Sequence, residues 1–86
     1  MLGFHMVKII FASAMEQYTR GEKEIRINVT TYRQACELLM REFPLLNKET
    51  LSEFSVAIDD EIIHEPLLES FELNSVVFFV PKIAAG

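Results

Sequence analysis

Lys23-Glu-Ile-Arg-Ile-Asn-Val29 alternates between polar and apolar residues, which is the pattern of a half-buried β-strand. Thr31-Tyr-Arg-Gln-Ala-Cys-Glu-Leu-Leu-Met-Arg-Glu-Phe-Pro44 follows after one residue, and its apolar residues recur at helical spacing instead. Thr31 and Gln34 fit a capping box at the start of this helix, and Pro44 stops it. The change of period predicts an α+β fold.

Further strand patterns lie on both sides of this stretch. They cover residues 7–12, 54–58, 61–63 and 75–80, and residues 45–53 leave room for a short helical turn. A polar segment containing Gly21 joins the first two strands as a hairpin. The predicted order is β-β-α-β-β-β, with the last strand beside the first. This order indicates a β-grasp, or ubiquitin-like, fold: a mixed sheet packed on one main helix.

Length and composition indicate one domain over residues 1–86, with residues 82–86 as a C-terminal tail. Half of the residues are hydrophobic and the net charge is -5, which argues against a disordered segment and against a nucleic-acid binder. No apolar run approaches the roughly 20 residues that span a membrane. The start lacks a signal-peptide pattern, so translation is expected to begin at Met1 or at Met6. The single Cys36 fits a cytoplasmic protein.

Residues for stand-alone catalysis are scarce. His64 is expected in an exposed loop and His5 in a frayed terminus, and neither has metal-ligand spacing. Cys36 lies on the helical stripe and is expected to be a buried, inert thiol. The acids of residues 59–61 are expected to be solvated at a turn. We therefore predict no bound metal and no cofactor held by the chain, and leave open whether it counts as an enzyme.

The end of the chain is unusual, because Lys82-Ile-Ala-Ala-Gly86 is short, largely apolar and ends on the smallest residue. Five extended residues reach at most about 16–18 Å, which suffices to enter another protein's active site. Glycine has no Cβ, so its carboxylate can approach a reacting group closely. A frayed terminus remains the alternative on physical grounds.

Four stretches, taken together in this order and spacing, carry a family resemblance. They are Val7-Lys-Ile-Ile-Phe-Ala12, residues 31–44, Phe54-Ser-Val-Ala-Ile-Asp-Asp-Glu-Ile-Ile63, and residues 66–67 with 77–86. The chain resembles the β-grasp sulfur carriers, namely the molybdopterin synthase small subunit and the thiamine-pathway sulfur carrier, and is closer to the first.

The resemblance implies that Gly86 is the working residue. A ubiquitin-activating-like adenylyltransferase would adenylate its carboxylate with ATP, and a sulfur donor protein would convert it to a thiocarboxylate. The tail would enter the large molybdopterin synthase subunit and deliver sulfur for molybdenum cofactor biosynthesis. The residues expected to contact the partner are Phe11, Phe79, Pro81, Lys82, Ile83, Ala84 and Ala85.

Two departures from the family pattern keep alternatives open. Ala85 stands where the family usually has glycine, and Glu72-Leu-Asn-Ser75 replaces a glycine-containing acidic turn. The Cβ of Ala85 disfavours positive φ and adds bulk in a narrow tunnel. The alternatives are a sulfur carrier of the thiamine or cysteine pathway, and a ubiquitin-like interaction module without sulfur chemistry.

Overall fold

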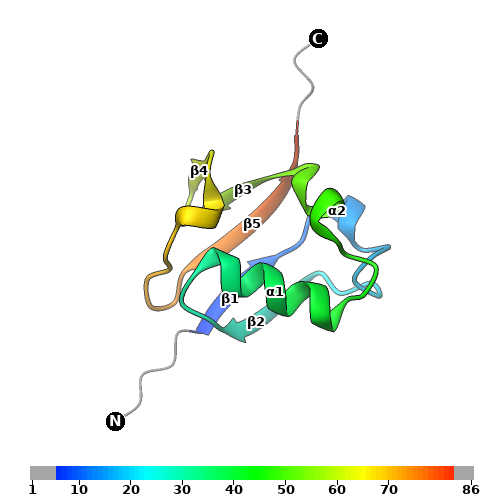
Figure 1. Cartoon of the computed structure of the whole chain (residues 1–86), viewed down its shortest axis with the longest axis horizontal. Helices are drawn as coiled ribbons and strands as arrows, with labels where there is room; N and C mark the ends of the chain where they lie inside the picture. Colours follow the sequence, from blue (N-terminus) through cyan, green and yellow to red (C-terminus); the bar gives the residue numbers. More distant parts are fainter. Residues whose placement is uncertain (1–5, 83–86) are drawn as a thin grey trace.

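The computed structural model describes residues 6–82, which form a five-stranded sheet and two α-helices (Figure 1). The chain order is β1 (Met6–Ile10), η1 (Ser13–Met15), β2 (Glu24–Asn28), α1 (Tyr32–Glu42), α2 (Lys48–Ser52), β3 (Phe54–Ile58), β4 (Glu61–Ile63), η2 (Pro66–Leu68) and β5 (Val76–Pro81). The elements η1 and η2 are single 3-10 turns. The short helical turn expected within residues 45–53 is α2.

The strand order across the sheet is β2-β1-β5-β3-β4. The central strands β1 and β5 are parallel, with Ile9 opposite Val77, and all other neighbours are antiparallel. The chain therefore crosses from one half of the sheet to the other through α1, and the last strand lies beside the first. This arrangement confirms the predicted α+β, β-grasp fold.

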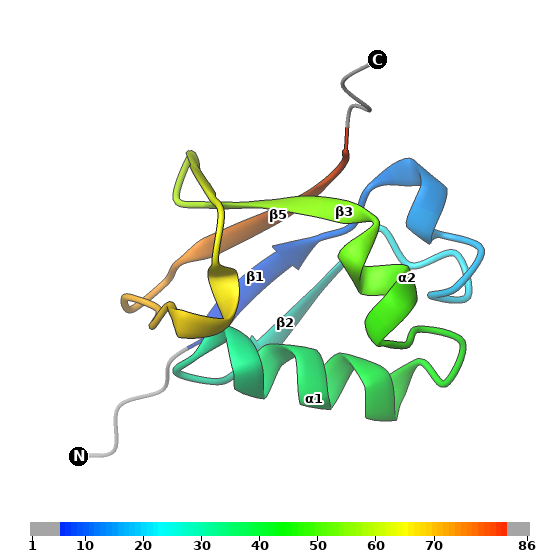
Figure 2. The same cartoon turned by 45° about the horizontal axis from the view of Figure 1, so that its top comes forward.

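Both helices lie on the same side of the sheet (Figure 2). Alternate side chains of the two central strands, including Val7, Ile9 and Val77, are fully buried under α1. The helix contributes Ala35 and Leu39, which are likewise fully buried. No other described element covers the opposite face of the sheet, so that face stays open.

The cap of α1 differs in one bond from the predicted capping box. The Gln34 N–H donates to Thr31 Oγ1 at 3.1 Å, as expected for an N-cap threonine. The Gln34 side-chain oxygen, however, accepts from the Thr30 N–H at 2.8 Å and from the Thr30 hydroxyl at 3.0 Å. The reciprocal bond is thus formed one residue earlier than in the standard box, while the N-cap bond of Thr31 is kept.

Asp59 has a structural role that the sequence prediction missed. Asp59 and Asp60 have φ values of 50° and 72°, which suit the tight turn between β3 and β4. The Asp59 carboxylate also accepts the Val76 N–H and the Ser75 hydroxyl, each at 2.9 Å. This carboxylate therefore fixes the start of β5 rather than being merely solvated.

Candidate functional site

The C-terminal end of β5 leads directly into the predicted tail. Pro81 is the Cα partner of Phe54, and the Lys82 N–H donates to the Glu53 carbonyl at 3.3 Å. Both Pro81 and Lys82 are exposed. Ile83, Ala84, Ala85 and Gly86 lie outside the described residues. The predicted tail therefore begins after β5, at the end of the sheet that lies near α2 (Figure 1).

Phe11 and Phe79 are not on the surface where the sequence analysis expected them. Only 5% of Phe11 and 2% of Phe79 is exposed. Their rings stack with centroids 6.4 Å apart, and Phe11 also meets Phe43 edge-on at 5.8 Å. Side chains alternate along a strand, and Phe79 shares its side with Val77, toward α1. Both phenylalanines are core residues, which corrects the expectation that they dock a partner.

The residue that faces outward is Phe78. Ala57 and Ile10 are its neighbours on the adjoining strands, so the three half-buried side chains form an apolar row across the open face. Val76 and Val80 flank this row on β5. The sequence could have predicted this row. If Val7, Ile9 and Phe11 face the core, the alternation of side chains along the strand places Ile10 on the other face.

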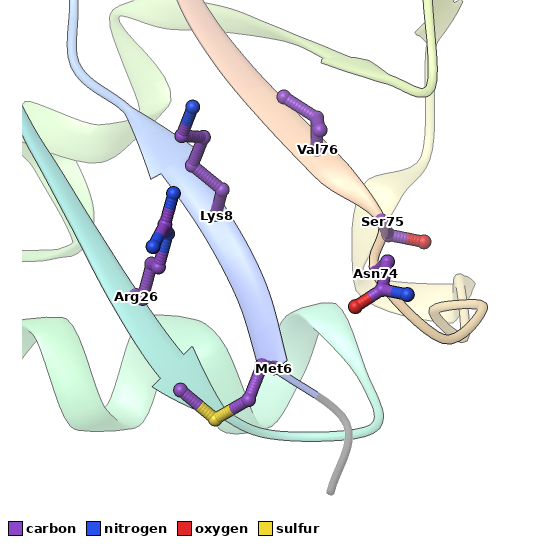
Figure 3. Close-up of a pocket in the computed structure, with 6 residues that line it drawn as sticks. All are labelled: Met6, Lys8, Arg26, Asn74, Ser75 and Val76. Carbon is purple, nitrogen blue, oxygen red and sulfur yellow. The ribbon is translucent and has the colours of Figure 1, made fainter.

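Two cations lie beside this apolar row at the far end of the open face (Figure 3). Lys8 and Arg26 are Cα partners on β1 and β2, and together with Val76 they line a shallow pocket of about 390 Å³. Lys8 Nζ is 3.9 Å from a carboxylate oxygen of Glu24. The open face thus combines a row of half-buried apolar side chains with two cations, Lys8 and Arg26.

Cys36 is buried on α1, as the sequence predicted, and it interacts with Tyr32 one turn earlier. Burial raises the pKa of the Cys36 thiol, and burial together with the neighbouring thiol raises the pKa of the Tyr32 phenol. A thiol held in its protonated form is a poor nucleophile. Cys36 is therefore a packing residue, and His64 is exposed beyond β4.

Within residues 6–82, no group of three or more His, Cys, Asp or Glu side chains could hold a metal ion. None of the helices described there is long and apolar enough to cross a membrane.

The fold and the open face define a class of molecule: a small β-grasp domain whose last strand lies at the centre of the sheet and ends at exposed Pro81. No protein-family model matches the chain, and no curated protein matches its sequence. Solved structures do match it over nearly the whole chain. Their sequence identities are low, so they establish the fold.

One similar structure is the complex of subunits 1 and 2 of molybdopterin-converting factor from Helicobacter pylori, with a TM-score of 0.69 and 21% identity over 94% of this chain and 99% of that one. Another is the BexX/CysO complex from Amycolatopsis orientalis, with a TM-score of 0.74 and 18% identity over 93% and 99%. A third is small archaeal modifier protein 1 from Methanosarcina acetivorans, with a TM-score of 0.75 and 13% identity over 99% and 100%. At the level of the fold, these neighbours confirm the resemblance found in the sequence.

Proposed function

We propose that this chain is a sulfur carrier whose working group is the carboxylate of Gly86. The observation that carries the proposal is the position of β5. This strand is held on both sides in the centre of the sheet and ends at exposed Pro81 and Lys82, beside an uncovered apolar face. A rigid body can dock by that face while the residues beyond Lys82 enter the partner.

The chemistry requires activation, because a carboxylate is a poor acyl donor until it carries a good leaving group. A ubiquitin-activating-like adenylyltransferase would join the Gly86 carboxylate to the α-phosphate of ATP and release pyrophosphate. The persulfide of a sulfur donor protein would then displace AMP and give an acyl disulfide. A thiol would next attack the donor's sulfur, form a disulfide with it and release the thiocarboxylate. The chain itself is a protein substrate and a subunit in this scheme, with no cofactor of its own, and we expect it in the cytoplasm.

The docking surface that we propose is the open face centred on Phe78. Its apolar row with Ala57 and Ile10 replaces Phe11 and Phe79 as the partner contact. Pro81 and Lys82 stand at the entry to the partner's tunnel, with Ile83, Ala84 and Ala85 inside it. Two neighbours of this fold are described as protein complexes, which supports a binding role for the domain.

We assign the sulfur to molybdenum cofactor biosynthesis, with the large molybdopterin synthase subunit as the acceptor of the tail. The ordered sequence resemblance supports this assignment, and one neighbour is a subunit of molybdopterin-converting factor. The thiamine and cysteine pathways remain the competing destinations, since the same activation chemistry serves each. The partner that binds the Phe78 face distinguishes among the three.

The first chemical step can be tested by ATP–pyrophosphate exchange with the organism's own adenylyltransferase. Wild-type protein should support exchange, and deletion of Gly86 should abolish it without unfolding the domain. Ala85→Gly should preserve or increase exchange, because it restores the residue usual in the family. Exchange that persists without Gly86 would contradict the assignment of the reacting carboxylate.

The second candidate is a ubiquitin-like interaction module without acyl chemistry, favoured by Ala85 and by the apolar open face. Such a module tolerates an extended C-terminus. A short C-terminal extension should therefore leave its function intact, whereas it should eliminate function in a sulfur carrier while partner binding persists. Complementation of a deletion strain, run in parallel with a binding measurement, separates the two.

A further inference from the structure

We propose that a groove on the helical side of the domain binds an acidic, apolar peptide segment of a protein partner. The groove lies between α1, α2, the β3–β4 hairpin and η2, and has a volume of about 890 Å³. In Figure 2 these elements surround the side of the sheet opposite its open face. The groove is therefore a second surface, which shares only Lys82 with the proposed entry of the tail. This inference does not depend on the sulfur chemistry.

The floor of the groove is apolar and already packed. Buried or half-buried side chains from both helices and from the hairpin form it, namely Cys36, Met40, Leu51, Val56 and Ile63. The turn η2 packs against α1 and closes one end. A rigid, concave and apolar floor is what a partner's side chains need in order to bury without reorganising the domain.

Exposed leucines project beside this floor. Leu67 is 50% exposed and Leu68 is 77% exposed, and both line the groove from η2. Ile62, at the edge of the sheet, is 55% exposed and lines it as well. These three large, exposed apolar side chains line the same groove. Exposed apolar surface that gathers in one place marks interaction sites on small domains.

The charged side chains that line the groove indicate the sign of the charge that a partner segment carries. Arg33, Lys48 and Lys82 line it, which is three of the chain's eight lysines and arginines. Only two of the thirteen acids, Glu37 and Glu65, do so. The charged residues that line the groove thus carry a net charge of +1, within a protein whose net charge is -5. Basic side chains at this position favour an acidic segment over a basic one.

A peptide fits this lining better than a nucleic acid or a small apolar ligand. Apolar side chains of the segment can occupy the floor while its carboxylates reach the basic side chains at the rim, as in other peptide-binding grooves. The negative charge of the whole domain opposes a phosphate backbone. An uncharged apolar ligand would leave the three cations without a partner.

The test is a selection from a display library of random linear peptides, using the whole chain as bait. The peptides recovered should be enriched in Asp and Glu together with Leu, Ile or Phe. Backbone amide chemical shifts should move for residues of α1, α2 and the β4–η2 segment when such a peptide is added. Recovery of mainly basic peptides would overturn the inference, as would shifts confined to β1 and β5.

Matched variants separate the groove from general surface effects. Leu68→Ser and Lys48→Glu should each weaken binding about tenfold. Leu45→Ser and Lys23→Glu change exposed residues outside the groove and should leave affinity unchanged; Leu45 is 64% exposed. Equal losses in both sets would overturn the inference. A dimer in solution that Leu68→Ser converts to monomer would overturn it too, because a second copy would then be the occupant.

Discussion

Phe78 and Phe79 are neighbours of the same type that face opposite sides of β5. Phe79 is almost fully buried against Phe11 and Tyr32, whereas Phe78 is half-buried in the open face. A shift of one residue exchanges a core position for a surface position, since side chains alternate along a strand. At this scale the structure revises the predicted docking residues most strongly.

The two phenylalanines should respond differently to truncation. Phe79→Ala removes a buried ring and should lower the free energy of unfolding by about 3–5 kcal/mol. Phe78→Ala should cost much less stability, yet should weaken binding to the large synthase subunit that we propose as the partner. Urea denaturation measures the first effect and titration calorimetry the second. Similar losses of stability in both variants would show that Phe78 is also a core residue.

The pKa shifts of Tyr32 and Cys36 predict the alkaline stability of the domain. Both groups keep their protons in the folded protein beyond the pH at which they lose them when unfolded, about 8.5 for Cys and 10 for Tyr. The folded state then binds more protons than the unfolded state, so the stability is complete below these values and falls as pH rises above them.

The expected decline is at most about 1.4 kcal/mol per pH unit for each group. Tyr32→Phe and Cys36→Ala should each flatten the profile, because each removes one titrating group. Denaturation midpoints measured between neutral and alkaline pH test this prediction. Wild-type and double-variant profiles that decline in parallel would contradict it.

Among the elements, α1 is the one whose start depends most clearly on single hydrogen bonds. Thr31→Ala removes the acceptor for the Gln34 N–H and should cost about 1 kcal/mol of stability. Thr31→Ser keeps the hydroxyl and should recover most of that loss. Chemical denaturation of the three proteins gives the comparison. A serine variant as unstable as the alanine variant would assign the effect to packing of the threonine methyl group.

The elements themselves could largely be predicted from the sequence, because local rules determine them. The alternation in residues 23–29, the stripe of α1 and the stop at Pro44 each depend on neighbouring residues. The role of Asp59 could not be predicted from the sequence, because its carboxylate accepts hydrogen bonds from Ser75 and Val76, which are distant in sequence. The groove was missed for the same reason: its lining comes from five separate elements, namely α1, α2, β3, β4 and η2.

For the whole molecule, the sequence indicated the topology and the structure defined two working surfaces. The tail begins at Lys82, which also lines the groove. The open face lies on one side of the sheet. The helical-side groove lies on the other. A small domain can therefore bind one partner through the sheet and still present the groove to a second.

Conversion of the Gly86 carboxylate to a thiocarboxylate changes the intact mass of the protein, which mass spectrometry measures. The chain is incubated with the adenylyltransferase, ATP and a sulfur donor protein, and its mass is compared with that of the same mixture lacking ATP. We expect the mass increase that corresponds to exchange of one oxygen for sulfur, located at Gly86 by fragmentation and absent from the Gly86 deletion. An unchanged mass, in an enzyme mixture that thiocarboxylates another carrier, would show that Gly86 does not carry sulfur.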